Sequence, residues 1–210
     1  MLKRVFDILV SSLALVVLFP AFLVFAILIK LDSPGPVFYR GVRVGRYRRL
    51  FRIFKFRSMV VNADRIGGFS TANDDPRITK VGQFLRKYKL DELPQLINVL
   101  IGDMSFVGPR PEVQQYVDLY TDEEKLILTV RPGISDWATL WNPDEGAVLA
   151  GSPNSEKTYL EKIRPEKIRL QMEYVRKRSF WVDLSIIVQT VASVVCRAKP
   201  RAMSVVNQKG

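Results

Sequence analysis

Two adjacent carboxylates, Asp91 and Glu92, are the residues of this sequence best suited to chemistry. Carboxylate oxygens suit Mg²⁺, which proteins commonly hold through one or two carboxylates together with substrate phosphates. A carboxylate can also act as a covalent nucleophile. The simpler alternative is structural. Asp91 would then be the N-cap of a helix that contains Leu96 and ends at Gly102, and Glu92 a solvated acid of its first turn.

Basic side chains flank this pair along the chain. Arg86 precedes it by a few residues, and Lys55 and Arg57 share the segment Lys-Phe-Arg-Ser-Met. Arg110 lies between two prolines. An arginine in a rigid Gly-Pro-Arg-Pro segment is preorganised for bidentate contact with a phosphate, although most loop arginines are simply solvated. Together these cations predict a substrate that carries phosphate groups.

The composition excludes several other mechanisms. The 210 residues include no histidine and one cysteine, Cys196. These counts exclude Ser-His, Cys-His and His-metal chemistry, an intrachain disulfide and a cysteine zinc site. Residues 1–60 carry eleven Lys or Arg and two acids, so they hold +9 of the net charge of +11. A basic block of this kind predicts an anionic partner.

An apolar segment near the N-terminus predicts membrane insertion. Residues 8–29 contain no charge and form, as a helix, a rod of roughly 33 Å, enough to cross a hydrocarbon core. Lys3 and Arg4 precede the segment and Lys30 follows it, so the positive-inside rule places both flanks on the cytoplasmic side. Because Pro20 disrupts helical hydrogen bonding near the middle, a re-entrant helix–break–helix is expected. A proline-kinked span is the simpler alternative.

The rest of the chain predicts a small α-rich mixed α/β domain with few short strands. Phe180 and Trp181 follow a basic run and begin an apolar segment, which is typical of an interfacial amphipathic helix. A helix packed on the domain is the alternative. The expected elements are two strands within 37–59 joined near Gly41–Gly45, a polar loop at 62–77, a helix capped by Thr79, loops at 104–112 and 142–156, helices near 112–128 and 157–177, and the apolar helix 180–196.

These features predict three parts of a membrane-associated, monotopic protein. Residues 1–32 form the re-entrant membrane segment, 33–178 the cytoplasmic catalytic domain, and 179–210 the interfacial helix and tail. An anionic phospholipid membrane is the expected surface partner.

Five motifs in one order carry a resemblance that covers roughly residues 1–196. The chain resembles the bacterial sugar transferase family, the monotopic polyprenyl-phosphate phosphoglycosyl transferases. One departure is visible, because the family's common Pro-Gly-Ile-Thr-Gly-Trp is here Pro-Gly-Ile-Ser-Asp-Trp, with Asp136 in place of glycine. If this region contacts the donor, the donor is expected to differ. The matching segments are 55–59, 89–95, 98–105, 107–111 and 131–134.

The resemblance implies a reaction. A UDP-sugar would donate its phosphosugar to a polyprenyl phosphate, such as undecaprenyl phosphate, giving polyprenyl-diphospho-sugar and UMP. This would be the first membrane step of glycoconjugate or polysaccharide synthesis, on the cytoplasmic face of the bacterial inner membrane. The resemblance assigns Asp91 as the nucleophile that forms a phosphosugar ester, and Asp91 with Glu92 as the Mg²⁺ ligands. It assigns phosphate binding to Arg57, Arg86 and Arg110, and Lys55, in the same motif as Arg57, is expected to bind phosphate with them.

Other interpretations remain open from the sequence. Direct transfer with Asp91 as a base would avoid the covalent ester. A membrane-surface scaffold of a polysaccharide assembly complex would share the membrane segment but needs no intact acidic pair. A nucleic-acid binder would use the arginines and aromatics of 37–59, but it leaves the motifs unexplained, so we expect no nucleic acid partner. The sequence also leaves room for a homodimer.

Overall fold

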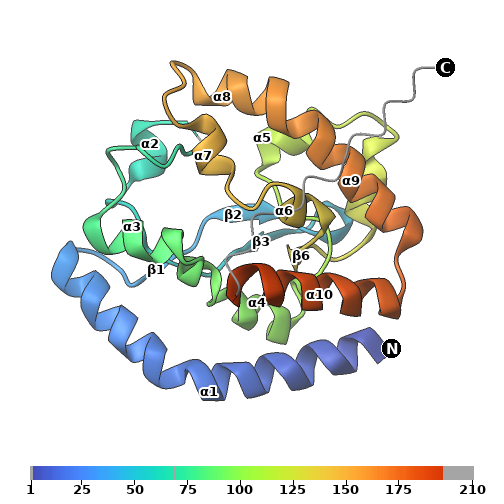
Figure 1. The fold of residues 1–210 in the computed structure, drawn as a ribbon, viewed down its shortest axis with the longest axis horizontal. Helices are drawn as coiled ribbons and strands as arrows, with labels where there is room; N and C mark the ends of the chain where they lie inside the picture. Colours follow the sequence, from blue (N-terminus) through green and yellow to red (C-terminus); the bar gives the residue numbers. More distant parts are fainter. Residues whose placement is uncertain (1, 69, 196–210) are drawn as a thin grey trace.

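The computed structural model describes residues 2–68 and 70–195 (Figure 1). Cys196 and the predicted tail after it lie outside the described residues. The fold is helix-rich with few short strands, which confirms the predicted class. The α-helices are α1 (Leu2–Asp32), α2 (Ala63–Ile66), α3 (Lys80–Lys87), α4 (Gln95–Ile101), α5 (Gln114–Val117), α6 (Trp137–Trp141), α7 (Glu145–Leu149), α8 (Ser155–Thr158), α9 (Arg164–Lys177) and α10 (Phe180–Val195). Shorter turns are the 3-10 helices η1 (Arg46–Arg48), η2 (Leu90–Glu92) and η3 (Glu124–Thr129) and the π-helix η4 (Tyr159–Ile163).

The described strands form three two-stranded sheets. Two are antiparallel, with Phe38 opposite Phe56 and Val44 opposite Leu50. The third is parallel and sets Val107 beside Ser135. The pairs are β1 (Phe38–Tyr39) with β4 (Lys55–Phe56), β2 (Val42–Val44) with β3 (Leu50–Arg52), and β5 (Ser105–Val107) with β6 (Gly133–Ser135).

Several predicted boundaries were wrong, because short capping interactions divide the chain more finely. Segment 104–112 contains β5, and the single helix predicted near 112–128 is two short pieces, α5 and η3. Helix α5 ends at Val117, and beyond it Thr121 accepts a hydrogen bond from the Glu124 backbone N–H, which starts a new turn. The predicted loop 142–156 holds α7 and the start of α8, and these helices begin where Asp144 and Asn154 accept backbone hydrogen bonds. The predicted cap Thr79 is confirmed, since it accepts from the Gly82 N–H at 3.0 Å.

Residues 37–59 form four strands rather than the two that were predicted. The turn of the β2–β3 hairpin lies later than predicted, where Tyr47 and Arg48 both have left-handed backbone conformations. This hairpin and the β1–β4 pair bring Lys55 alongside the elements that carry the acidic pair, because β4 packs against η2.

Helix α1 is long and apolar enough to cross a membrane. The α-helix continues through Pro20, so the prediction of two separate helices is not confirmed. Figure 1 shows that the helix nevertheless changes direction along its length and runs along one edge of the molecule, beside α4 and α10. Its outer side chains are exposed and apolar: Leu2, Val5, Ile8, Leu9, Leu13, Val16, Val17, Phe19, Leu23, Val24, Ile27, Leu28 and Leu31.

Both ends of α1 are bound to the rest of the domain. At the N-terminal end the Lys3 ammonium contacts Asp183 of α10 at 2.6 Å, and Arg4 donates to the last carbonyls of α4. At the C-terminal end the Asp32 carboxylate accepts from the Val81 N–H at 3.0 Å, and the Ile29 side chain is buried against Phe56 and Leu85. The helix is therefore fastened to one body at both ends.

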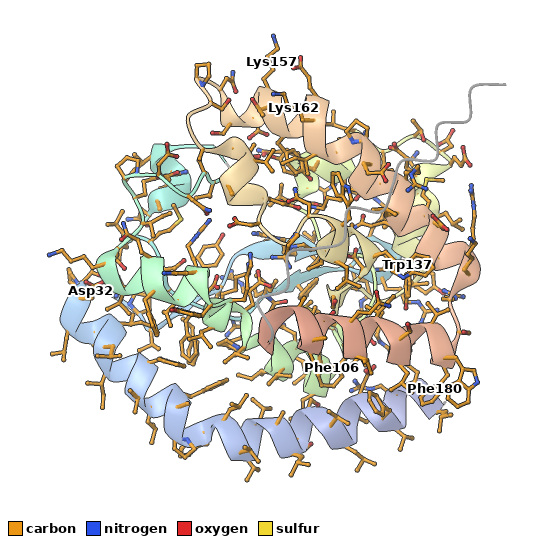
Figure 2. All side chains as sticks on the ribbon, viewed as in Figure 1. Asp32, Phe106, Trp137, Lys157, Lys162 and Phe180 are labelled. Carbon is orange, nitrogen blue, oxygen red and sulfur yellow. The ribbon has the colours of Figure 1, made fainter. Side chains whose placement is uncertain are left out.

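Helix α10 packs against the domain, as the second interpretation predicts, and its interfacial role stays a prediction. Ile186 is fully buried in the domain, whereas Trp181 is 74% exposed. Figure 2 places Phe180 and Asp32 near opposite ends of α1, with Lys157 and Lys162 at the far edge of the molecule. Helix α1, with its exposed apolar side chains, and these two lysines thus lie at opposite edges of the molecule.

Candidate active site

Three elements bring a carboxylate between two cations. Glu92 lies in η2, and its Oε1 is 2.7 Å from the Nζ of Lys55 on β4. Arg110, from the loop after β5, donates through Nη1 to Glu92 Oε2 at 3.1 Å and through Nη2 to Oε1. This bidentate contact orients the guanidinium. Lys55, Glu92 and Arg110 are distant in sequence, so the fold builds this cluster.

Asp91 is the member of the acidic pair that the protein leaves free. Its residue surface is 7% exposed, yet its carboxylate accepts no hydrogen bond from any residue that the structure describes. Burial raises the pKa of Asp91, and the negative charge of Glu92 adds to this, while the charges of Lys55 and Arg86 oppose it. A buried carboxylate without a partner is available to an external group, such as a cation or an electrophilic phosphorus.

The charge states within the cluster follow from its geometry. Burial alone would raise the pKa of Glu92, but the Arg110 and Lys55 charges outweigh it and hold that pKa well below its usual range. Burial lowers the pKa of the Lys55 ammonium despite the nearby Glu92. The Glu92 charge raises the pKa of Arg110. Glu92 therefore stays ionised and paired, whereas Asp91 is the carboxylate whose proton affinity is increased.

The predicted helix cap at Asp91 is wrong. Asp91 lies inside the 3-10 turn η2, and α4 begins at Gln95 with Pro94 in the N-cap position. Lys89, which follows α3, adopts a left-handed backbone conformation and is the N-cap residue of this turn. Proline suits the first turn of a helix, so Pro94 moves the helix start beyond the acids. The end of the helix at Gly102, with a positive φ of 96°, is confirmed.

The predicted basic residues do not all reach the acidic pair. Lys55 and Arg110 contact Glu92, and the charge of Arg86 acts on Asp91 from the last turn of α3. Arg57 lies elsewhere. Its guanidinium is bound by the carbonyls that follow α1, donating to Pro34 at 2.7 Å and to Ser33 at 2.8 Å. The structure therefore uses Arg57 to hold the end of α1, and its phosphate role stays a prediction.

A buried polar cluster behind Arg110 was not found from the sequence. Lys167 of α9 is 4% exposed and lies 2.6 Å from Glu112 and 2.9 Å from Glu145. Burial opposes the charged form, but these acids hold the pKa of Lys167 well above its usual range. Glu145 also acts electrostatically on Arg110. No sequence pattern joins these residues, because they come from separate elements.

Gln95 is a second residue to which the sequence assigns no role. It is fully buried, and both polar atoms of its amide lack a partner among the described residues. It lies one turn after Asp91 in segment 89–95, one of the segments that match the family. That position was the sequence signal that could have identified it. A buried amide with unused hydrogen-bonding capacity next to a candidate site is unusual.

The candidate magnesium ligands are limited to the acidic pair. No group of three or more His, Cys, Asp or Glu residues is arranged to hold a metal within residues 2–68 and 70–195. Asp91 and Glu92 can nevertheless fit an ion that is shared with substrate phosphates, since burial and neighbouring charges, rather than hydrogen bonds within the described residues, set the environment of the Asp91 carboxylate.

Comparisons with known proteins agree with these motifs. The profile of the bacterial sugar transferase family matches residues 1–197. UDP-N-acetylgalactosamine-undecaprenyl-phosphate N-acetylgalactosaminephosphotransferase of Aeromonas hydrophila is 39% identical over 197 residues, covering 92% of this chain and 44% of that protein. UDP-glucose:undecaprenyl-phosphate glucose-1-phosphate transferase of Escherichia coli K12 is 40% identical, covering 91% of this chain and 39% of that protein.

A shorter relative shows that the match is not confined to the long enzymes. The exopolysaccharide production protein ExoY of Sinorhizobium fredii is 36% identical over 207 residues, covering 91% of this chain and 84% of that protein. This chain thus spans less than half the length of the first two relatives and most of the length of the third.

Proposed function

Because the chain belongs to the bacterial sugar transferase family, we propose that it transfers a sugar 1-phosphate group from a UDP-sugar to undecaprenyl phosphate. The products would be undecaprenyl-diphospho-sugar and UMP. Two of the relatives described above are named for transfers to undecaprenyl phosphate, with different sugars. The family match and the phosphate-compatible charges support the reaction class, and the sugar is left to experiment.

The observation that carries the proposal is the contrast between Asp91 and Glu92. Glu92 is paired with two cations, so it is poorly placed to attack. Asp91 is buried without a hydrogen-bond partner in the described chain, beside the charges of Lys55, Arg86 and Lys89. Those cations favour its ionised form and would attract a diphosphate. Asp91 is therefore the better nucleophile of the two.

In the first step an Asp91 carboxylate oxygen would attack the sugar-linked phosphorus of the donor. The new bond joins that oxygen to phosphorus, while the bond between this phosphorus and the bridging oxygen breaks and UMP leaves with the electron pair. In the second step an oxygen of undecaprenyl phosphate would attack the same phosphorus, and the Asp91 carboxylate leaves unchanged. Such transfers depend mainly on positioning and charge neutralisation, which matches a site with no histidine.

The basic residues would divide the work of holding phosphates. Lys55 and Arg110 already lie on either side of Glu92, and Arg86 acts from α3. Asp91 and Glu92 would hold Mg²⁺, which when bound would supply charge neutralisation on the transferred phosphate. Glu92 would keep Lys55 and Arg110 in place, since it contacts both.

A re-entrant position of α1 in the membrane forms the second part of the proposal. Both ends of α1 are bound to the same domain, so a helix that crossed the bilayer completely would separate contacts that the domain makes at Lys3 and Asp32. A helix that enters one leaflet and returns keeps both. The exposed apolar side chains of α1 and Trp181 on α10 supply the surface for the lipid. The catalytic domain would then lie on the cytoplasmic face, where the basic N-terminal region favours anionic phospholipid.

The proposal is tested by UMP release from the purified full chain. The protein in detergent or nanodiscs is incubated with Mg²⁺, undecaprenyl phosphate and a panel of UDP-sugars, beside Asp91→Asn. Release with at least one donor, lost in Asp91→Asn, is the expected result. Folded, membrane-bound protein that releases no UMP with any donor would overturn the proposal and favour a scaffold.

A further inference from the structure

The carboxyl ends of the parallel strands β5 and β6 place two loops against each other. Arg110 follows β5 and Asp136 follows β6. The Gly108 N–H donates to the Ser135 carbonyl, and the Gly133 N–H donates to the Pro109 carbonyl, each at 3.0 Å. A Cβ at Gly133 would lie 2.1 Å from the Gly108 nitrogen, so glycine permits this close approach. The pairing of two strands therefore brings the Arg110 loop to the start of α6.

Asp136 is fully buried at this junction and binds groups from three directions. Its Oδ1 accepts from the backbone N–H of Thr139, capping α6 at 2.7 Å, and from the Thr139 hydroxyl. Its Oδ2 accepts from the Arg110 backbone N–H at 3.2 Å. The same Oδ2 accepts from Nε2 of Gln171 on α9 at 3.1 Å. The two carboxylate oxygens thus have separate tasks, one at the helix and one at the Arg110 loop.

We infer that Asp136 is a positioning residue for Arg110, with Gln171 orienting the Asp136 carboxylate. The inference rests on the proposed function, in which Arg110 binds the donor phosphates. Glu92 orients the guanidinium of Arg110, and Asp136 holds its backbone. Gln171 is fully buried and donates to Asp136 from α9. The Arg110 loop is therefore held against a long helix, Arg164–Lys177.

A second brace keeps the loop folded when the first is weakened. Glu112, two residues after Arg110, contacts the buried Lys167 at 2.6 Å. Lys167 and Gln171 are one turn apart on α9, so this helix supports the loop at two points. Loss of the Asp136 contact should therefore shift Arg110 without unfolding the loop.

The substitution Asp136→Asn separates the two tasks of Asp136. The remaining Oδ1 can still cap α6, since asparagine is a good N-cap. The new Nδ2 would face the Arg110 N–H, so two donors would meet where a donor met an acceptor. Gln171 can adapt, because its Oε1 has no partner among the described residues and an amide flip would let it accept from Nδ2. The contact that is lost is the one to Arg110.

The matched control is Asp144→Asn. Asp144 also caps a short helix, α7, by accepting from a backbone N–H, and also accepts from the amide of Asn73. The same chemical change there removes a side-chain acceptor without touching the Arg110 loop. This control should keep the kcat/KM of the wild type within about twofold.

The experiment is a double-mutant cycle on the full chain in detergent, with two readouts: the kcat/KM of UMP release and the affinity for UDP measured by calorimetry. Asp136→Asn should lower kcat/KM by about 10- to 100-fold, the loss expected for a misplacement of about 1 Å. It should weaken UDP binding about fivefold, as for one lost hydrogen bond. In an Arg110→Ala background the same substitution should change either value by less than twofold, because it acts only through Arg110.

The outcomes separate this inference from the proposed function. If the wild type releases UMP, the function stands, and either of two results overturns the inference. One is that Asp136→Asn behaves like Asp144→Asn. The other is that the fold-losses of Asp136→Asn and Arg110→Ala multiply in the double variant. If the wild type releases no UMP but binds UDP, the function fails and the UDP cycle alone decides the inference. If the wild type neither releases UMP nor binds UDP, both are overturned.

Discussion

Neutralising the two adjacent acids should change stability in opposite directions. Glu92→Gln removes the charge that pairs with Lys55 and Arg110, leaving two partly buried cations without their partner. Asp91→Asn removes a buried carboxylate that has no hydrogen-bond partner in the described chain. The first change should destabilise the fold and the second should stabilise it, although both should abolish transfer.

The structure sets the size of these effects. Removing one partner of a buried ion pair costs about 3–5 kcal/mol. The Lys55, Glu92 and Arg110 side chains are 20%, 16% and 26% exposed, so water screens part of the cost and about 3 kcal/mol is expected for Glu92→Gln. In a chain of this size that lowers Tm by about 6–12 °C. Because burial raises the pKa of Asp91, its ionised form costs stability above that pKa, and Asp91→Asn should raise Tm by a few degrees.

The assay is thermal unfolding of the three proteins in one detergent, followed by intrinsic fluorescence between about pH 4 and pH 8. The gain from Asp91→Asn should shrink as the pH falls through the raised pKa, since the wild-type carboxyl then becomes neutral as well. Asp75→Asn cannot serve as the control for removing a carboxylate that has no ion-pair partner, because the Asp75 carboxylate is paired with Arg77. Equal Tm shifts of the same sign for Asp91→Asn and Glu92→Gln would refute the reasoning.

Three further predictions concern activity and packing. If Asp91 is the nucleophile, transfer needs its ionised form, and because burial raises its pKa the kcat/KM of UMP release should fall on the acid side with a midpoint above that of an ordinary aspartate; a midpoint at or below the ordinary value in a pH profile would contradict the assignment. Arg57→Ala should lower Tm by several degrees and leave the KM for the UDP-sugar nearly unchanged, whereas Arg110→Ala should raise that KM; equal KM increases in steady-state assays would instead support a phosphate role for Arg57. Lys167→Met removes the buried cation that pairs with Glu112 and Glu145 and should destabilise the fold by about 3 kcal/mol, and an unchanged denaturation midpoint would show that the cluster is not structural.

The parts of the fold that sequence predicted are those set by local chemistry. Thr79 caps α3 by accepting from the N–H of Gly82, three residues later, and Gly102 ends α4 by adopting a positive φ. The apolar segment, read from hydrophobicity alone, is α1. The caps Asp144 and Asn154 carry the same kind of local signal, so α7 and α8 could have been predicted from residues that were instead treated as loop.

The site depended on contacts that local patterns do not contain. Lys55 meets Glu92 across 37 positions of sequence, and the motif that contains Lys55 also contains Arg57, which turns toward the carbonyls after α1. Strand alternation would place Lys55 and Arg57 on the same face, but β4 ends at Phe56 and Arg57 lies beyond it. The two side chains therefore reach different partners, and proximity in sequence does not imply a shared ligand. Asp136 stood out only as a departure from the family pattern, and its contact with Arg110 required the pairing of β5 with β6.

The central claim is that Asp91 carries the transferred group. The direct measurement is intact-protein mass spectrometry of the full chain after incubation with Mg²⁺ and its UDP-sugar in the absence of undecaprenyl phosphate. The account predicts an added mass of one phosphosugar, located on Asp91, absent in Asp91→Asn and discharged when undecaprenyl phosphate is added. UMP release by Asp91→Asn at the wild-type rate, or turnover by the wild type with no adduct under rapid quenching, would contradict it.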